Sequence, residues 1–273
     1  TPLTGCQLLE KMPDFSHSRT TFILRARKLL SLNRLEMQSQ YFLHSFWHLQ
    51  FTSSYSHMNV IDLFAGCGGF SLGFKQENFR ILGCADWESR CIETLKINSH
   101  RKDSMFFLEE DLRLSFEPSG KNSTEIIKSL SSTKVDGIIG GPPCQAYSLA
   151  GRVQDEHNME NDYRNYLFEN YVKWLKEIKP TFFVLENVTG MLSAAPGGTP
   201  VIRLISEAIN EAGFVIPQIG KNLVFNLYDL GGAQNRKRVI LFGVNKKKLF
   251  NHVDVIEKFY SSMRRQSEDK NKN

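Results

Sequence analysis

The chain of 273 residues has a hydrophobic content of 41%, enough for one large domain, and no apolar run near the roughly 18 residues of a membrane helix. It carries no secretory signal, and its five cysteines form no Cys-x-x-Cys pair, so we expect a reduced, cytoplasmic protein without disulfides, metal or membrane contact. The net charge of +5 at pH 7 comes from the flanks, because residues 60–245 hold 20 basic against 22 acidic side chains, and it is weak evidence for DNA binding.

The first 57 residues differ in pattern from the rest of the chain. They contain an amphipathic stretch around Phe22–Leu35 and an aromatic-rich piece around Tyr41–Phe51, and neither carries recognisable chemistry. Met58 stands directly before the first strand-like run. We expect residues 1–57 to be an N-terminal extension that is not native or is poorly ordered, with Met58 as the natural start. One folded domain is then expected over residues 58–250.

Residues 60–245 alternate strand-like apolar runs with helix-like stretches, which is typical of an α/β domain with helices on both faces of a mostly parallel sheet. The clearest helix is Tyr163–Ile178, where apolar residues recur at three- and four-residue steps before Pro180. Seven strands are expected: Val60–Phe64, Arg80–Ala85, Met105–Leu108, Val135–Ile139, Phe182–Leu185, Leu223–Phe225 and Val239–Phe242. Residues 251–273 are expected to form a charged C-terminal tail that is disordered from Met263 onward.

A glycine-rich turn follows the first strand. Such a turn lets an α/β fold approach a nucleotide-like ligand closely. Its glycines do not fit G-x-G-x-x-G, because Ser71 stands where the third glycine should be, and this argues against a dinucleotide pyrophosphate. S-Adenosylmethionine, which has no phosphate, is the obvious remaining cofactor. The residues expected to bind it here are Phe64, Ala65, Gly66, Cys67, Gly68 and Gly69.

Acidic residues end the next two strands. Asp86 is placed to accept hydrogen bonds from ribose hydroxyls, and Trp87 can stack on adenine. After the third strand, Asp111 suits the adenine amino group, with Leu112 beside it. One acid after a strand is usually a solvated loop residue. Three such features in order, on the three strands that a nucleoside would span, favour a cofactor site.

A proline-rich turn follows the fourth strand, with the sequence Gly141-Pro-Pro-Cys-Gln145. Two prolines stiffen the chain before Cys144, as suits a nucleophile on a rigid, exposed turn. The alternative interpretation is a small buried hydrophobe, because thiols without a partner are usually buried and inert. The motif alone leaves both interpretations open.

Taken together, these blocks resemble the DNA cytosine-5 methyltransferases over about residues 58–245. The matching blocks, in order, are Asp62–Gly69, Asp86-Trp87, Asp111, Pro142-Pro-Cys-Gln145, Glu186-Asn-Val188 and Gln234-Asn-Arg-Lys-Arg238. The resemblance implies a Rossmann-like methyltransferase fold, S-adenosylmethionine as cofactor and double-stranded DNA as substrate. It also implies that residues 58–250 are a catalytic domain and that Pro143 and Leu167 contribute to the cofactor site.

The resemblance assigns four catalytic residues. Cys144 would add to C6 of a cytosine flipped out of the duplex, which makes C5 nucleophilic enough to attack a methyl group. Glu186 would contact N3 and the exocyclic amine, Arg238 would lie near O2 and the thiol, and Arg236 nearer the DNA backbone and the catalytic loop. Without the resemblance, the favoured interpretations are a surface carboxylate that closes a strand for Glu186 and a solvated turn before Val239 for the two arginines.

Further DNA contacts are expected mainly from the polar loop at residues 146–165, which follows the nucleophile and would close over the flipped base. A loop of this composition is also compatible with simple solvation. The expected contact residues are Gln145, Ser148, Arg152, Arg164 and Gln234.

Two family blocks have no counterpart in these 273 residues, namely the long target-recognition region and a Gly-Asn-Ser/Ala-Val block. We therefore expect the catalytic subunit of a two-chain enzyme of a restriction-modification system, with both blocks on a second polypeptide. A truncated gene or fragment is the alternative. Two other functions remain open, a tRNA cytosine-5 methyltransferase relative and a non-catalytic module that binds cofactor or DNA. The DNA sequence recognised cannot be read from the chain.

Overall fold

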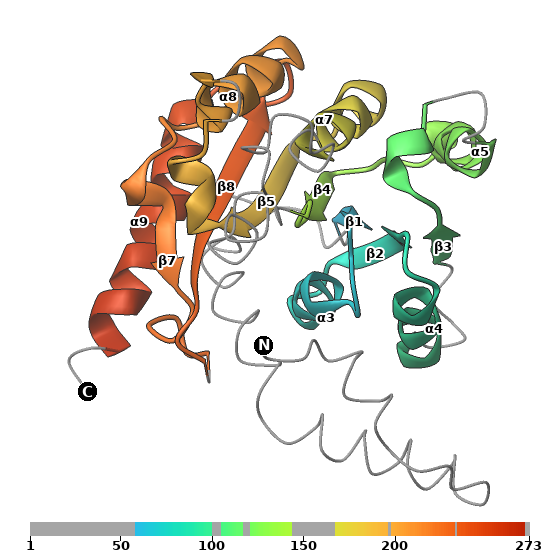
Figure 1. The fold of residues 1–273 in the computed structure, drawn as a ribbon, viewed down its shortest axis with the longest axis horizontal. Coiled ribbons are helices and arrows are strands. Elements are labelled where there is room, and N and C mark those ends of the chain that lie inside the picture. Colours follow the sequence, from blue (N-terminus) through green and yellow to red (C-terminus); the bar gives the residue numbers. More distant parts are fainter. Residues whose placement is uncertain are drawn as a thin grey trace, which may run out of the picture.

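A mostly parallel sheet of eight strands organises the protein (Figure 1). The computed structural model describes residues 58–99, 105–116, 121–143, 167–195, 198–232 and 234–270. The strands are β1 Asn59–Leu63, β2 Arg80–Asp86, β3 Phe106–Glu109, β4 Gly137–Gly140, β5 Phe182–Val188, β6 Phe214–Val215, β7 Val224–Asn226 and β8 Lys237–Asn245. Their order across the sheet is β3-β2-β1-β4-β5-β8-β6, and β7 also pairs with β8.

The first five strands of this order are parallel, and β8 is antiparallel to β5, β6 and β7. The α/β class and the mostly parallel sheet are confirmed. The expected count of seven strands is wrong, because the two-residue β6 (Phe214–Val215) also joins the sheet. Two residues are too short a run to produce an apolar pattern, so only the pairing with β8 identifies this strand.

Helices cover both faces of the sheet, as expected. Six α-helices are described: α3 Gly69–Gln76, α4 Ser89–Asn98, α5 Lys121–Ser129, α7 Leu167–Ile178, α8 Val201–Glu211 and α9 His252–Lys270. Short 3-10 turns occupy Leu112–Leu114, Leu130–Ser132, Thr189–Leu192 and Lys221–Leu223. The first residues of the helix expected at Tyr163–Ile178 lie outside the described ranges, and the remainder forms α7.

Two neighbouring phenylalanines of β5 show how side chains pack on the two faces of the sheet. Because successive side chains of a strand point to opposite faces, Phe182 and Phe183 pack on opposite faces of the sheet. Phe182 contacts Phe79 and Phe242, and Phe242 stacks on Phe259 of α9 with ring centroids 4.3 Å apart. Phe183 meets Tyr171 of α7 and Phe214 of β6 on the other face.

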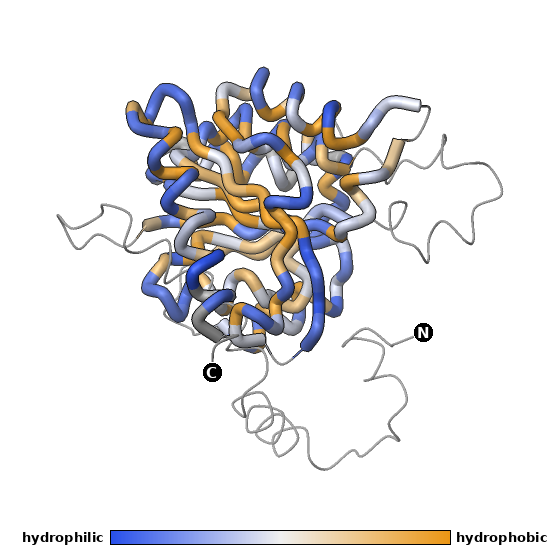
Figure 2. Tube along the Cα trace, turned by 90° about the vertical axis from the view of Figure 1, so that its left-hand side faces the viewer, coloured by the Kyte–Doolittle hydropathy of each residue, from blue (hydrophilic) through white to orange (hydrophobic). Residues whose placement is uncertain are grey.

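Figure 2 shows the consequence for the whole molecule, with hydrophobic residues concentrated along the central strands and hydrophilic ones toward the periphery. The largest side chains with almost no exposed surface include Trp174 and Tyr171 of α7. Among the parts of the chain that the structure describes, every helix is too short or too polar to span a bilayer.

The expectation of a disordered C-terminal tail is wrong for the residues that the structure describes. The structure places His252–Lys270 in the helix α9, which packs against β8. Four of its side chains are buried at helical spacing, namely Ile256, Phe259, Tyr260 and Met263. The charged residues on its outer face dominate the composition of this segment and mask its apolar stripe, although spacings of three and four residues predict such a helix.

Tyr260 of α9 replaces a missing strand partner in the middle of β8. On its outer edge β8 pairs with β7 through Lys237–Val239 and with β6 through Val244 and Asn245, and no other described strand pairs with the residues between them. The Tyr260 hydroxyl accepts a hydrogen bond from the Phe242 N–H at 2.8 Å and donates one to the Ile240 carbonyl at 3.1 Å.

Tyr260→Phe is therefore expected to lower the free energy of unfolding by about 1–3 kcal/mol, because it strands a buried N–H and a buried carbonyl without removing the ring. Urea unfolding followed by circular dichroism measures this. Tyr228→Phe is the matched control: Tyr228 is 52% exposed, and its loss of a hydroxyl should change stability by less than about 0.5 kcal/mol. Equal effects of the two substitutions would contradict the bridging role of Tyr260.

Candidate active site at the carboxyl edge of the sheet

The order of the strands creates a switch point at β1. From β1 the chain builds outward through β2 and β3, and then returns to add β4 and β5 on the other side. In open α/β sheets, ligands bind beside the carboxyl ends of the strands at such a point. The turns after β1, β2, β3 and β4 all emerge at this edge because these strands are parallel.

The glycine-rich turn after β1 has an unusual backbone. Phe64 has a φ of 56°, Gly66 of 53° and Gly68 of 90°, all in the left-handed region. A side chain at Gly68 would also collide with Leu95 of α4, because a Cβ there would lie 2.5 Å from the Leu95 Cδ2. At Gly66 a Cβ would meet no atom within 4 Å. The turn is thus pressed against α4 on one side and open on the other.

Asp86 at the end of β2 holds this turn in place. One carboxylate oxygen accepts the Gly66 N–H at 2.8 Å, and the other accepts the Glu88 N–H at 3.0 Å. A carboxylate can accept about four hydrogen bonds, so these two leave capacity for ribose hydroxyls. The neighbouring Trp87 is 67% exposed and is therefore accessible to a stacking partner.

Asp62 in β1 has a role that sequence reasoning missed. Its carboxylate accepts hydrogen bonds from the Ser71 N–H at 3.1 Å and the Ser71 hydroxyl at 2.7 Å, which ties the first turn of α3 to the strand. This contact explains why serine stands where a dinucleotide motif has its third glycine. Burial raises the pKa of Asp62 to about 7, against the lowering effect of the Ser71 hydrogen bonds. The sequence does contain a sign of this role, because Asp62 is an acidic residue inside an apolar strand.

The raised pKa of Asp62 predicts a pH-dependent stability. Because an unfolded aspartate has a pKa near 3.9, the folded state binds the extra proton between about pH 4 and pH 7. The stability from this proton is complete below about pH 4 and is lost as the pH rises through 7. Asp62→Asn keeps an acceptor for Ser71 but cannot titrate. Between pH 5 and pH 8 the wild type should lose on the order of 2 kcal/mol relative to this variant.

Urea unfolding of both proteins at pH 5 and pH 8 measures this difference. Asp254→Asn, at an exposed position in the first turn of α9, controls for the removal of one carboxylate. A wild type and an Asp62→Asn variant whose stabilities change in parallel with pH would rule out a raised pKa at Asp62.

The acidic segment after β3 is tied to its own neighbours. The Asp111 carboxylate accepts the Arg113 N–H at 3.0 Å and the Arg113 Nε at 2.6 Å, and these contacts with Arg113 lower the pKa of Asp111. Sequence reasoning did not identify Arg113. Leu112 is only 2% exposed and packs in the core, so its side chain offers almost no surface to a bound cofactor.

The ends of β4 and β5 meet at a second cluster. Gly140 pairs with Leu185, so the next residues, Gly141 and Glu186, lie side by side. A Cβ added at Gly141 would lie 3.2 Å from the Glu186 Oε2, which shows how closely the carboxylate approaches the start of the proline-rich turn. At Gly140 a Cβ would clash with the Leu63 carbonyl at 2.3 Å, so glycine is required where β1 and β4 come together.

Glu186 forms an ion pair with Arg238, with 2.6 Å between Oε1 and Nε. The side chains are 25% and 16% exposed, so the pair is largely shielded from water. Burial raises the pKa of Glu186, although Arg238 and Arg236 act in the opposite direction. Burial, and after it the charge of Arg238, lowers the pKa of Arg236. Antiparallel pairing of β5 with β8 brings Arg238 close to Glu186 across more than fifty positions of sequence.

The structure thus gathers Glu186, Arg238 and Arg236 beside the turn that begins at Gly141. Pro143 is partly buried at the end of the described part of that turn, Leu167 is buried at the start of α7, and Gln234 is exposed before β8. Five predicted residues lie outside the described ranges: Cys144, Gln145, Ser148, Arg152 and Arg164. Within the ranges that are described, no three His, Cys, Asp or Glu side chains are grouped so as to hold a metal ion.

Comparison with known proteins identifies the family. The profile of the C-5 cytosine-specific DNA methylases matches residues 58–272, which includes α9. The type II methyltransferase M.Bpa9945I of Bacillus paralicheniformis is 34% identical, over 70% of this chain and 54% of that protein. M.DdeI of Desulfomicrobium norvegicum is 33% identical, over 76% of this chain and 46% of that protein.

A solved structure agrees with these sequence matches. A prophage-encoded protein of E. coli, assigned as a DNA modification methyltransferase, superimposes with a TM-score of 0.54 at 30% identity, over 70% of this chain and 47% of that one. The chain therefore spans about half the length of the relatives that it matches. With its fold, its glycine turn and its Glu186–Arg238 pair, the chain belongs to the C-5 cytosine-specific DNA methylase family.

Proposed function

We propose that this chain transfers a methyl group from S-adenosylmethionine to C5 of cytosine in double-stranded DNA, as the catalytic part of a type II restriction-modification methyltransferase. The observation that carries the proposal is the shielded Glu186–Arg238 pair beside Gly141, at the same sheet edge as the open glycine turn. Family membership supports the same reaction.

The residues around β1 and β2 fit the cofactor. A Cβ at Gly66 or Gly69 would meet no atom within 4 Å, so the turn leaves room for a ligand against its backbone. Asp86 offers remaining acceptor capacity for ribose hydroxyls, and the exposed Trp87 offers a face for adenine. When bound, S-adenosylmethionine supplies an electrophilic methyl group on a sulfonium sulfur.

The residues after β4 and in β5 suit activation of the base. Cys144, the residue after Pro143, would add as a thiolate to C6, which forms the S–C6 bond and shifts the electron pair of the C5–C6 double bond onto the ring. Glu186 would hold a proton at N3 and Arg238 would stabilise the charge at O2. C5 would then have the electron pair to bond to the methyl carbon, and the electrons of the methyl–sulfur bond would stay on the sulfur, which would leave as a neutral thioether. Loss of the C5 proton and departure of the thiolate restore the ring.

This chemistry requires a base outside the helix stack, because C6 and C5 cannot be reached in a stacked duplex. Residues 146–165 would close over the flipped cytosine, with Arg152 and Arg164 on phosphates and Gln145, Ser148 and Gln234 near the base or its strand. These contacts remain predictions from the resemblance.

The remaining half of such an enzyme would carry target recognition. The chain covers 54% or less of the length of each of these three relatives, which supports a contribution from outside these 273 residues. We propose that a second polypeptide supplies the target-recognition region and the Gly-Asn-Ser/Ala-Val block. A longer form of this chain would supply them equally well.

Transfer of labelled methyl from S-adenosylmethionine to DNA tests the proposal, with 5-methylcytosine identified by mass spectrometry of the nucleosides. The chain is assayed alone and with the product of the neighbouring reading frame, and tRNA serves as the competing substrate. We expect weak transfer by the chain alone and strong, sequence-specific transfer with the second protein. Transfer to tRNA instead of DNA would overturn the substrate, and strong specific transfer by the chain alone would overturn the need for a partner.

A further inference from the structure

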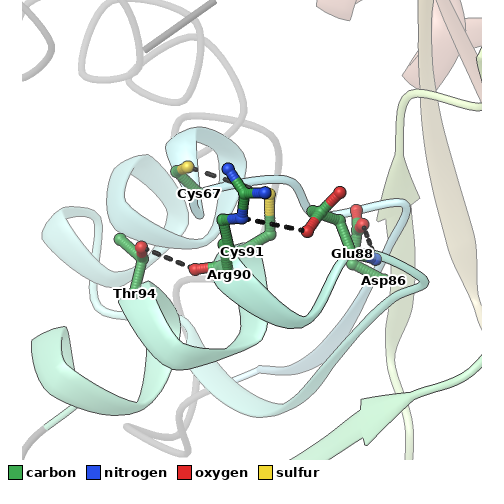
Figure 3. A network of polar contacts seen from close by, with 6 residues as sticks. All are labelled: Cys67, Asp86, Glu88, Arg90, Cys91 and Thr94. Atoms are coloured by element: carbon green, nitrogen blue, oxygen red, sulfur yellow. Dashed lines mark hydrogen bonds and ion pairs between the residues drawn. The ribbon is translucent and has the colours of Figure 1, made fainter. Parts of the chain in front are cut away.

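Two thiols face each other beside the glycine turn (Figure 3). The sulfur of Cys67, in the turn after β1, lies 3.9 Å from the sulfur of Cys91, the third residue of α4. Cys67 is exposed and Cys91 is buried. The proposed reaction uses neither thiol as a nucleophile, and the sequence indicated no pairing of cysteines.

The two segments that carry these thiols are joined by the same contacts that shape the turn. The Cys91 N–H donates to the Glu88 carbonyl at 3.0 Å, and the Glu88 N–H donates to Asp86, whose other oxygen holds the Gly66 N–H. The close approach of Gly68 to Leu95 presses the turn onto α4 one helical turn beyond Cys91. The approach of the two sulfurs is therefore built into the packing of the turn.

We propose that Cys67 and Cys91 are a redox-active pair that closes a reversible disulfide on exposure to a hydroperoxide. The exposed Cys67 thiolate would attack the peroxide, break its O–O bond and become a sulfenic acid. The Cys91 thiol would then displace water from that sulfur and form the disulfide. When the peroxide is hydrogen peroxide, two thiols and one peroxide yield one disulfide and two molecules of water. A buried thiol within contact of an exposed one is suited to this resolving role.

Closure of the bridge changes the cofactor cradle. A disulfide needs about 2.05 Å between its sulfurs, so the observed 3.9 Å has to shorten by nearly half. The turn can yield more easily than α4, because Cys67 stands between two glycines and a Cβ at Gly66 would meet no neighbouring atom. Movement of the turn displaces the Gly66 N–H from Asp86. Cofactor affinity should fall, an expectation that rests on the proposed function.

Linkage makes the effect reciprocal. If the disulfide weakens cofactor binding by a given factor, saturating cofactor must disfavour the disulfide over the dithiol by the same factor. We expect a factor of roughly 5 to 150, the usual range of coupling between two sites. The bridge thus becomes easier to reduce when S-adenosylmethionine is bound.

The experiment uses the full chain treated with hydrogen peroxide, and peptide mapping by mass spectrometry then identifies linked cysteines. Calorimetry measures the dissociation constant of S-adenosylmethionine for the reduced, oxidised and dithiothreitol-treated protein. Binding is measured in place of activity because Cys144 is itself a thiol open to oxidation. Cys91→Ser and Cys91→Ala are the matched controls: neither can form the linkage, so the change in affinity that peroxide causes in a folded variant measures oxidation of Cys67 alone, and the wild type should recover fully with dithiothreitol only through its bridge.

A Cys67–Cys91 linkage with a reversible, roughly 5- to 150-fold rise in the dissociation constant supports the proposal. Absence of that linkage after peroxide overturns the redox pair, and a linked protein with unchanged affinity overturns its effect on the cofactor site. If the linkage forms after peroxide but the reduced protein binds no S-adenosylmethionine, the result contradicts the proposed function instead. The two failures are therefore distinguishable.

Discussion

Cys144→Ser should reduce methyl transfer to DNA at least about a thousandfold, because a serine hydroxyl is far less ionised at neutral pH and cannot add to C6 at a useful rate. Single-turnover transfer of labelled methyl, with the second polypeptide present, measures the chemical step directly. Calorimetry on the same variant should give an unchanged affinity for S-adenosylmethionine, since the glycine turn and Asp86 are left intact.

Cys6→Ser provides the control for replacing a thiol, because Cys6 lies outside residues 58–272, the part that matches the family. It should keep the wild-type rate. A Cys144→Ser variant that transfers methyl groups nearly as fast as the wild type would refute the covalent mechanism. It would also favour the earlier alternative, in which this cysteine is only a small hydrophobe in a proline turn.

Glu186→Gln should lower kcat/KM by about 10²–10⁴-fold, the usual contribution of a general acid. Burial raises the pKa of Glu186, and this keeps the proton available at N3 to a higher pH than an ordinary glutamate would. Activity that needs the protonated acid is present below the raised pKa and falls as the pH rises through it. The wild type should therefore show a basic limb in its pH profile that the variant lacks.

A profile of kcat/KM against pH for both proteins provides the measurement. Glu211→Gln is a suitable control, because its side chain is 74% exposed at the end of α8 and its ion pair with Lys176 spans 3.9 Å. It should reproduce the wild-type profile. If Glu186→Gln retained the same basic limb, the limb would belong to another group and Glu186 would not be the acid.

Several site features could be predicted because they depend on local sequence. The glycine turn, Asp86-Trp87 and the Glu186 and Arg238 blocks each lie at or near one end of a strand, and the carboxyl ends of parallel strands meet at one edge of a sheet. What the blocks did not reveal is how the side chains pair. Gly66 with Asp86, and Asp111 with Arg113, are contacts that depend on turn geometry, which no periodic pattern records.

Other features were missed because they join distant segments. Asp62 was recognised as part of a motif, yet its hold on Ser71 depends on how α3 returns to β1. The role of Tyr260 depends on a gap between β6 and β7 along β8, and β6 itself becomes a strand only through that pairing. For α9 the apolar spacing is present in the sequence, but the surrounding charges favour an expectation of disorder.

The sequence by itself determined the α/β class, the family and the candidate residues, because hydrophobic period and short ordered motifs are local properties of the chain. Tertiary structure alone decided the electrostatics of the site. Burial raises the pKa of Asp62 and Glu186, and the β5–β8 register sets Arg238 opposite Val188, two positions from Glu186, where the ion pair forms. Desolvation and pairing across the sheet depend on which distant atoms exclude water from a group, and that is known only once the chain is folded.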